Sequence, residues 1–315
     1  MTGAGIARDR ELWYPADRLA ELLPPAAAIL AVGAALHARR AAATPDPVRQ
    51  RLESGHTTLL TMPAAASWGL GVKVLTLTEG NRERGRATIE GVMLCFDGDD
   101  GRLIGILDGA RLTALRTAAV AGWATDRLAS PGAHHLVVAG AGAQALAQVD
   151  AVCAVRPITR VTCWNRTSER AGLLADQVRR GHPAISVLVA DDLREAVATA
   201  DVVTLVTASR TPLLERRDLP ERCHLNAMGA HQPDARELGS DVIAAAAVFA
   251  DTVEGCLMEA GDLLIPIAEG LLTRDQVHEL ADAGPAAAGF TVMKSVGTAS
   301  FDLACARSVL ERAGS

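Results

Sequence analysis

The sequence has no cysteine pair spaced as C-x-x-C and no apolar run long enough to cross a bilayer. Its six cysteines are scattered, which is typical of reduced thiols in a cytosolic compartment and argues against a disulfide framework or a zinc site. The apolar run at 26–36 is too short for a transmembrane helix, and charged residues at 8–11 precede any apolar segment. We therefore expect a cytoplasmic protein with no targeting signal, no membrane association and no metal.

Excess positive charge is also missing. The formal net charge is −6, which argues against a general nucleic-acid-binding protein. Hydrophobic residues make up 49% of the 315 residues and charged residues 22%, a balance typical of globular domains. This length predicts one large domain or two ordinary ones.

A glycine-rich turn after a β-branched run is the central motif. Residues 135–139 (HLVVA) predict a strand, and an alanine- and leucine-rich helical pattern follows the turn. The turn has the Gly-x-Gly-x-x-Ala form of a dinucleotide fingerprint, and its residues are Gly140, Ala141, Gly142, Ala143, Gln144 and Ala145. Gly140 permits a tight turn, Gly142 allows close approach of a pyrophosphate, and Ala145 allows close packing of helix on strand. The helix N-terminus then favours the phosphates.

The regions on either side of this motif differ in pattern. Short β-type runs at 57–62, 71–78, 87–96 and 102–107 come before it without intervening helices, which predicts a mostly antiparallel module. A helical run at 113–129 links this module to the motif. After it, strand patterns at 135–139, 160–164, 186–189, 202–206, 224–228, 248–250 and 291–294 alternate with helical ones, as in a doubly wound parallel sheet. We expect an α/β protein whose last helix, 299–313, returns to the first module.

The end of the second nucleotide-domain strand indicates which dinucleotide binds. An acidic residue about 20 positions past the glycines would bind the ribose hydroxyl of NAD, but none stands between Ala151 and Ser168. Asn165, Arg166 and Thr167 stand there instead, and Arg166 can pair with a 2′-phosphate. We expect NADP(H) to be favoured over NAD(H), with Arg170 also at this site. The alternative is that Asn165 caps the next helix and Arg166 is a solvated charge.

Two cations occupy apolar surroundings. Lys73 lies within a predicted apolar strand, and Arg116 lies on a helix otherwise made of threonine, alanine, leucine and valine. Charges are rarely buried without a partner, so both are candidates for binding an anion. Arg49 is less telling, because Arg51 beside it fits an ordinary loop charge equally well.

Several stretches together resemble the ornithine cyclodeaminase/mu-crystallin family across nearly the whole chain. They are residues 47–49 (PVR), 61–64 (TMPA), 71–73 (GVK), 108–119 (DGARLTALRTAA), 140–145 (GAGAQA), 164–167 (WNRT), 226–230 (NAMGA) and 294–297 (KSVG). The resemblance implies a homodimer with a Rossmann domain at 119–298 and a discontinuous substrate and dimerisation domain at 1–118 and 299–315. It also implies a nicotinamide cofactor and a small α-amino or α-imino acid substrate.

The family's site residues carry over by position. The resemblance assigns the substrate carboxylate to Arg49, Lys73 and Arg116, with Met62 beside them. We predict catalytic roles for Lys73, Arg116 and His231, although His231 departs from the family pattern. It assigns further cofactor contacts to Thr117, Thr207, Ala208, Ser209, Met228, Gly229, Val296 and Gly297. For the two loops 207–209 and 228–230, simple turn chemistry is the alternative interpretation.

Two departures from the family pattern bear on the reaction. Ornithine cyclodeaminases resembling this chain carry an aspartate where His231 stands, and Asp234 follows three residues later. Cyclodeamination is therefore disfavoured, whereas His231 can supply the proton that a reductase needs, unless it is only a loop histidine beside the nicotinamide. Residues 281–285 also lack a Gly-Arg element that relatives often have.

These observations predict an NAD(P)H-dependent reductase of a small cyclic imino acid, of the pyrroline-2-carboxylate or piperideine-2-carboxylate type. Three alternatives remain: an ornithine or lysine cyclodeaminase, an enzyme for reductive amination of an open-chain acid, and a non-catalytic binding protein like the crystallin relatives. The carboxylate-binding cations weigh against the last of these.

Overall fold

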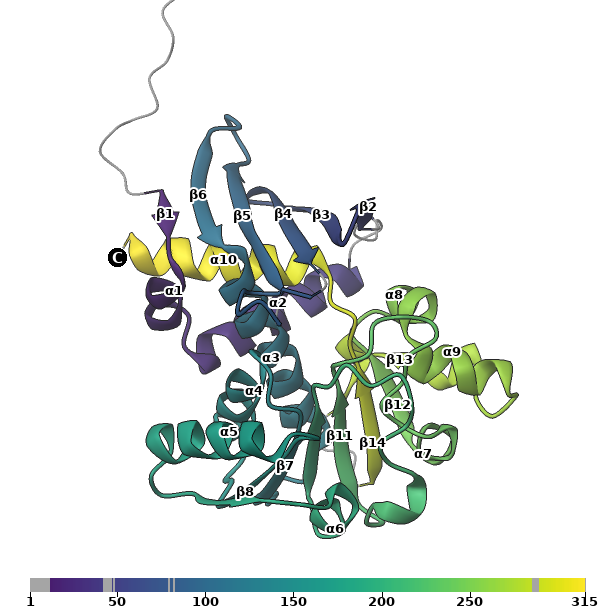
Figure 1. The fold of residues 1–315 in the computed structure, drawn as a ribbon. Coiled ribbons are helices and arrows are strands. Elements are labelled where there is room, and N and C mark those ends of the chain that lie inside the picture. Colours follow the sequence, from purple (N-terminus) through teal and green to yellow (C-terminus); the bar gives the residue numbers. More distant parts are fainter. Residues whose placement is uncertain are drawn as a thin grey trace, which may run out of the picture.

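The computed structural model describes residues 12–41, 47, 49–78, 80–81, 83–284 and 289–314. Residues 8–11, from which we predicted the lack of a targeting signal, lie outside this range, as do Val48 and Pro285. Two sheets lie on opposite sides of the described part of the molecule, with a long helix between them (Figure 1). No single described helix has the length and apolar character to cross a membrane; α1 and α2, bent by 81° at their junction, pass that test only as a pair.

The first sheet has six strands in the order β1-β6-β5-β4-β3-β2. Neighbours from β2 to β6 are antiparallel, as predicted, and β1 pairs with β6 in parallel. The elements of this module are β1 (Trp13–Tyr14), α1 (Ala16–Leu22), α2 (Pro25–Ala41), β2 (Gln50–Ser54), β3 (Thr57–Ala66), β4 (Gly69–Thr78), β5 (Ile89–Asp97) and β6 (Leu103–Asp108).

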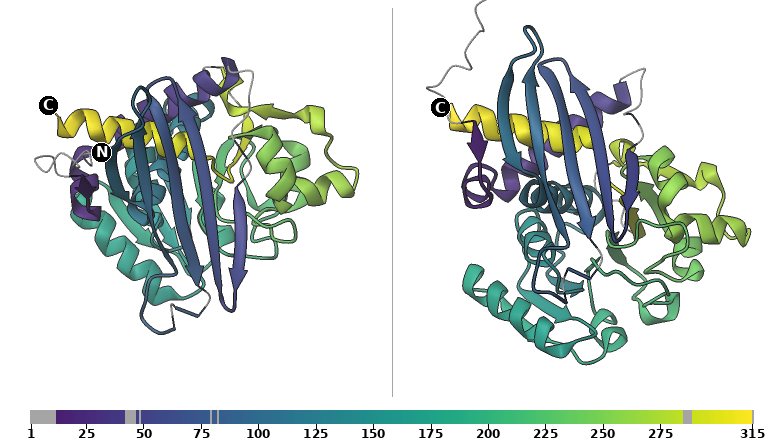
Figure 2. Two further views of the ribbon diagram at one scale, coloured as in Figure 1. Left: turned by 90° about the horizontal axis from the view of Figure 1, so that it is seen from above. Right: turned by 45° about the horizontal axis from the view of Figure 1, so that its top comes forward.

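One face of this sheet is buried and the other is open. Met62, Lys73, Met93 and Leu107 alternate with less buried residues and point inward. The inner face packs against α3 (Gly109–Leu128) and α10 (Ala299–Ala313), and α2 packs on these two helices, whereas no described helix covers the outer face (Figure 2). The final helix thus returns to the first module, as the sequence predicts.

The second sheet is parallel throughout, in the order β13-β12-β14-β11-β10-β7-β8-β9. The strand order reverses between β7 and β10, which places a ligand crevice at the carboxyl ends of these two strands. Its strands are β7 (His135–Ala139), β8 (Arg160–Trp164), β9 (Ser186–Val189), β10 (Val202–Leu205), β11 (Cys223–Ala227), β12 (Ala247–Ala250), β13 (Val277–Glu279) and β14 (Phe290–Lys294). Its helices are α4 (Ala145–Cys153), α5 (Ser168–Gly181), α6 (Leu193–Val197), α7 (Ser240–Ala245), α8 (Val253–Glu259) and α9 (Gly261–Ala268), with short 3₁₀ turns at Arg216–Asp218, Arg274–Gln276 and Leu280–Asp282.

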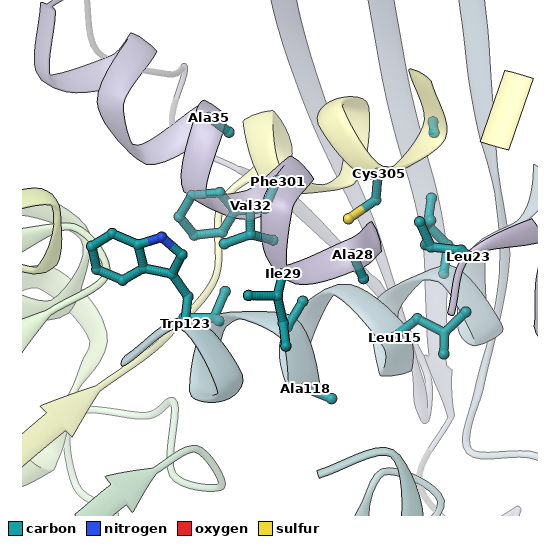
Figure 3. Close-up of a cluster of buried hydrophobic side chains, with 14 of the residues drawn as sticks. Leu23, Ala28, Ile29, Val32, Ala35, Leu115, Ala118, Trp123, Phe301 and Cys305 are labelled. Carbon is teal, nitrogen blue, oxygen red and sulfur yellow. The ribbon is translucent and has the colours of Figure 1, made fainter. Parts of the chain in front are cut away.

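Helix α3 joins the two sheets and is buried along most of its length. Asp108 caps it by accepting a hydrogen bond of 2.7 Å from the backbone N–H of Arg111. Side chains from α2, α3 and α10 form one core, in which Ile29, Trp123 and Phe301 meet (Figure 3). Close packing depends on Gly33, because a Cβ there would lie 2.5 Å from the indole nitrogen of Trp123.

Most predicted elements are confirmed, and the differences have simple causes. The strands at 135–139, 160–164 and 186–189 and the last helix have the predicted bounds. Strand β2 was not predicted, because its five residues are polar or exposed and show no alternation. The helix predicted at 113–129 begins at Gly109, directly after its cap. The domain limits at 118 and 298 stay a prediction, because residue 118 lies inside α3.

Candidate active site

The predicted fingerprint forms a turn between β7 and α4. Gly140 has φ 108°, and a Cβ there would lie 2.7 Å from the carbonyl oxygen of Val206, so this position requires glycine. A Cβ on Gly142, by contrast, would meet no atom within 4 Å. Ala145 is fully buried at the start of α4. The open space at Gly142, in front of a helix N-terminus, fits the pyrophosphate of a dinucleotide.

The predicted 2′-phosphate residues gather at the end of β8. The Oδ1 atom of Asn165 accepts a hydrogen bond of 3.2 Å from the N–H of Ala141, inside the glycine turn. The alternative that Asn165 caps α5 is therefore wrong, since Thr167 occupies the N-cap position. Arg166 is exposed, and within the described chain neither Arg166 nor Arg170 forms an ion pair. Both guanidinium groups are free to bind a phosphate.

The loops after β10 and β11 converge on one buried carboxylate, Glu237, which sequence reasoning missed. Its Oε1 accepts hydrogen bonds of 2.7 Å from both the N–H and the hydroxyl of Thr207, and its Oε2 accepts one of 2.7 Å from the N–H of Gly229. The N–H of Ala230 lies 3.4 Å away. Burial raises the pKa of Glu237 despite these donors and the positive charge of Lys294. Glu237 therefore fixes the two loops that we assigned to the nicotinamide.

A buried ion pair supports Glu237 from behind. The ammonium of Lys294 lies 2.8 Å from Asp262 and donates a 2.5 Å hydrogen bond to the carbonyl of Ala230. Asp262 in turn accepts from the backbone N–H groups of Glu237 and Leu238 at 2.8 and 3.1 Å. Burial lowers the pKa of Lys294, but the carboxylates of Asp262 and Glu237 outweigh it and raise that pKa above its usual value. We call Lys294, Asp262 and Glu237 the loop cluster.

The two cations that the sequence places in apolar segments lie close together in the structure. Lys73 on β4 and Arg116 on α3 both bind Asp302 of α10, at 2.7 Å to Oδ2 and 3.0 Å to Oδ1. Lys73 and Asp302 are fully buried and Arg116 nearly so. Met62 stands opposite Lys73 in the strand register. We call Lys73, Arg116 and Asp302 the carboxylate cluster, and Asp302 is a second residue that sequence reasoning missed.

Arg116 uses only its Nε atom in this cluster. Its terminal nitrogens lie against Gly297, where φ is 78° and a Cβ would collide with the guanidinium. In the described chain those terminal nitrogens have no hydrogen-bond partner in the protein. Thr117 follows Arg116 on the helix and is also buried. One edge of the Arg116 guanidinium is therefore free to bind an anion.

Lys73 has an unusual pKa for a lysine. Burial is the largest cause that lowers it to about 7, and the positive charges of Arg116 and Arg49 lower it further, while Asp302 raises it. The ammonium is therefore only partly protonated near neutral pH. A second anion beside it would favour the charged form.

Arg49 lies across the cleft between the two modules. Its Nη2 donates hydrogen bonds of 2.9 Å to the carbonyl oxygens of Val296 and Gly297, and its Nε lies 3.1 Å from Oε1 of Glu259. These residues and Met62 line one cavity. The structure thus brings Arg49 and Met62, predicted to bind the substrate, together with Val296 and Gly297, predicted to bind the cofactor, and it adds Glu259, a third residue that sequence reasoning missed.

His231 lies at the edge of this site. Its Nδ1 atom is 3.2 Å from the carbonyl oxygen of Gly229, and part of the ring is open to solvent. Partial desolvation lowers the pKa of His231, the charges of Arg49 and Lys294 lower it further, and Glu259 raises it. Asp234 instead points to the surface, where it pairs with Arg210.

The remaining loop positions have mixed outcomes. Met228 is buried at the end of β11, beside the loop that Glu237 fixes. The Ser209 hydroxyl donates a hydrogen bond of 2.6 Å to the carbonyl oxygen of Thr211. Ser209 therefore stabilises its own loop, as the alternative interpretation predicts. Ala208 is exposed between Thr207 and Ser209. Relatives often have a Gly-Arg element in the region of residues 281–285. Here the chain forms the 3₁₀ turn Leu280–Asp282, and Asp282 accepts a hydrogen bond of 2.8 Å from Arg40 of α2.

Comparisons with known proteins agree with this fold. The model of the ornithine cyclodeaminase/mu-crystallin family matches residues 18–315. A Delta(1)-pyrroline-2-carboxylate reductase of Bacillus cereus is 35% identical over 287 residues, 86% of each chain. The solved Thermococcus litoralis Delta(1)-pyrroline-2-carboxylate reductase, in complex with NADH and L-proline, superposes with a TM-score of 0.91 at 29% identity, covering 96% of this chain and 97% of that one. An archaeal alanine dehydrogenase dimer with bound NAD superposes with a TM-score of 0.88 at 25% identity, covering 96% and 95%. The chain therefore belongs to the ornithine cyclodeaminase/mu-crystallin family.

Proposed function

We propose that this protein uses a reduced nicotinamide cofactor to convert a small cyclic imino acid, of the pyrroline-2-carboxylate or piperideine-2-carboxylate type, to the L-amino acid. The carboxylate cluster carries the argument. With Lys73 protonated, Lys73 and Arg116 bring two positive charges and Asp302 only one negative charge, all nearly or fully buried. One more carboxylate would balance this site and satisfy the free edge of Arg116.

The reaction needs little more than orientation and a proton. Bound at the glycine turn and the loops fixed by Glu237, the cofactor would supply a hydride. Lys73 and Arg116 hold the substrate carboxylate, so that the adjacent carbon of the C=N bond is fixed toward those loops. When that carbon gains the hydride, the π-electron pair of the C=N bond moves to nitrogen. His231, whose lowered pKa makes its protonated form a stronger acid, is our proton donor.

We also propose that the cofactor is NADP(H) rather than NAD(H). The support is the pair of unpaired guanidinium groups at Arg166 and Arg170, together with the lack of any acid at the end of β8 in the described chain. Two arginines four positions apart, one just ahead of α5 and one in its first turn, can bind a 2′-phosphate through charge-assisted hydrogen bonds. Both relatives with solved structures named above were determined with NADH or NAD bound, so this preference would be a difference within the family.

A homodimer formed through the open sheet face is part of the proposal. The register places Pro63, Val72, Leu94 and Ile106 in one row across β3, β4, β5 and β6, on the face that no described helix covers. The exposed Leu70 lies on the same sheet. A contiguous exposed apolar face on a soluble protein marks an interaction surface. A second copy of the chain is the partner that the archaeal relative's dimer favours. The free thiols of all six cysteines support a reducing, cytoplasmic location.

The test is a screen of NADPH oxidation with pyrroline-2-carboxylate, piperideine-2-carboxylate, and pyruvate with ammonia or methylamine. We expect turnover of a cyclic imino acid without added ammonia. Strict dependence on ammonia would indicate reductive amination of an open-chain acid instead. Conversion of ornithine to proline without net cofactor consumption, and with no imine reduction, would indicate a cyclodeaminase and overturn the proposal. Asp234 argues against that outcome, because Arg210 holds it at the surface.

A further inference from the structure

The site holds two carboxylates, and they differ in what they can reach. Asp302 is fully buried, with Lys73 on one oxygen and Arg116 on the other. Glu259 pairs with Arg49 alone, its side chain is 24% exposed, and it lines the same cavity as Met62 and Gly297. Of these two carboxylates, Glu259 is the one open to a ligand in that cavity; Glu254 also lines the cavity but is exposed and has no ion-pair partner in the described chain.

Glu259 belongs to the nucleotide-binding side of the molecule. It is the last residue of α8, and the loop that carries His231 packs directly against the next turn of chain. The N–H of Gly261 donates 3.1 Å to the carbonyl of Gln232, and a Cβ on Gly261 would collide with the carbonyl oxygen of Ala235. Glu259 is therefore held beside His231 and Arg49, whereas Lys73 and Arg116 approach from β4 and α3.

The substrate of the proposed reaction has charges of both signs. Its carboxylate is negative, and its nitrogen is positive once protonated, both as the iminium that accepts a hydride and as the product ammonium. The carboxylate cluster can bind only the negative end. A buried or half-buried cation needs a negative partner, and neutral hydrogen-bond acceptors do not supply that charge.

We propose that Glu259 binds the protonated nitrogen of the substrate, so that cations of the first module and a carboxylate of the nucleotide domain orient the two ends of one small zwitterion. This inference rests on the proposed function. Glu259 favours the protonated imine, whose carbon accepts the hydride while the π-electron pair moves to nitrogen. The resulting amine takes up one proton, and Glu259 then pairs with the ammonium. Glu259 is in this sense a catalytic residue.

Two ligands that share a five-membered ring and a carboxylate but differ in the charge at nitrogen test the proposal. L-Proline carries a positive ring nitrogen, whereas pyrrole-2-carboxylate has the same ring size and carboxylate but a neutral nitrogen. Binding of each to the enzyme–NADP⁺ complex is measured by titration calorimetry for wild type and Glu259→Gln. We expect Glu259→Gln to weaken L-proline by about 30-fold or more and pyrrole-2-carboxylate by less than about threefold. Equal weakening of the two ligands, or none, would overturn the assignment.

A matched control comes from outside this cavity. Glu221 is exposed ahead of β11, is absent from the cavity lining and forms no ion pair within the described chain, so Glu221→Gln should leave the affinities for both ligands unchanged. The control shows whether loss of any negative charge on the nucleotide-binding side is sufficient. A Glu221→Gln protein that loses L-proline selectively would contradict a specific role of Glu259.

A second background separates nitrogen binding from a mere tether for Arg49. If Glu259 only positions Arg49, then adding Glu259→Gln to Arg49→Met should change nothing further. If Glu259 binds the nitrogen, the double variant should still lose L-proline relative to pyrrole-2-carboxylate by about tenfold or more against Arg49→Met alone. Failure of the proposed function has a different signature, because the wild-type protein would then bind neither ligand and reduce no imine.

Discussion

The carboxylate cluster and the loop cluster are built from the same kinds of groups and are equally buried. They differ in the charge and the hydrogen-bond donors that stay unpaired. Lys73, Arg116 and Asp302 leave one positive charge and one unbonded guanidinium edge. In the loop cluster, Glu237 accepts four hydrogen bonds from backbone and hydroxyl donors, and Lys294 and Asp262 are bonded to the same loops. Burial of charge alone therefore does not identify a ligand site. The unused donors beside an excess of positive charge do, because they can bind an anion.

The largest effect that tests this comparison is expected in the carboxylate cluster. Arg116→Leu should lower kcat/KM about a thousandfold, or roughly 3–5 kcal/mol, because the substrate carboxylate loses its charged partner in a buried site. The affinity for NADPH, measured by fluorescence titration, should be almost unchanged. Lys73→Met should act similarly, and the double variant should be less than additive, because both groups bind one carboxylate. A folded Arg116→Leu protein that keeps more than about a tenth of the wild-type kcat/KM would place Arg116 outside the site.

The loop cluster should respond in stability instead. Glu237→Ala leaves three backbone N–H groups without their acceptor, so we expect the free energy of unfolding to fall by about 3–4 kcal/mol, as measured by denaturant titration. The exposed Glu254→Gln serves as the control for loss of an acid. If Glu237→Ala is as stable as wild type, the loop cluster is not a structural clamp and the contrast between the clusters fails.

A third change moves from the substrate to the cofactor. Arg166→Asp should weaken NADPH by about 2–4 kcal/mol, because a charge-assisted pair is lost and repulsion of the phosphate is added. NADH, which has no 2′-phosphate, should be affected far less. The ratio of the two dissociation constants gives the result directly, and an unchanged ratio would mean that Arg166 does not contact the cofactor.

The smallest effect is expected from pH. Because the pKa of Lys73 is lowered to about 7, its positive charge is complete below that pH and is lost above it. Affinity for pyrrole-2-carboxylate, whose own charge is constant over this range, should therefore be greatest below pH 7. It should fall as pH rises, by up to about tenfold per unit. Since the folded-state pKa is depressed, the contribution of Lys73 to folding stability has the opposite sign and increases from about pH 7 toward its unfolded value. Flat affinity from pH 6 to pH 9 would mean that Lys73 stays charged.

What the sequence could predict depended on how far apart the partners lie in the chain. The strand at 135–139 and the turn after it were predicted because the whole pattern is local. Lys73 and Arg116 were found because a charge in an apolar segment is itself a local signal. Their common partner was not, because Asp302 is 229 residues from Lys73 and 186 from Arg116. The one available hint was an acid between Phe301 and Leu303 in the first half of the last helix, where no other residue is charged.

Glu237 and Glu259 carried no such signal. Glu237 follows Arg236 in a stretch without regular secondary structure, where an acid is usually solvated. Glu259 ends a short helix in a region whose helices the sequence did not predict. Both acquire their roles only when the loops after β10, β11 and β14 are placed side by side. That placement is a property of the sheet order and not of the neighbouring residues.

Helix α3 has a mechanical consequence. Its 20 residues run without a break from the carboxylate cluster to the nucleotide sheet, where Thr125 accepts a hydrogen bond of 2.9 Å from Asn226. Such a helix is stiff, because bending it would break backbone hydrogen bonds and disturb a packed core. We expect the first module and the nucleotide-binding side to rotate relative to each other about the axis of α3, with the chain at 295–298 as the second connection between them. Any such rotation would carry the Glu259 side of the cleft toward or away from Arg116, so the span between the two charged ends, and with it the ring size that fits, would change with every opening.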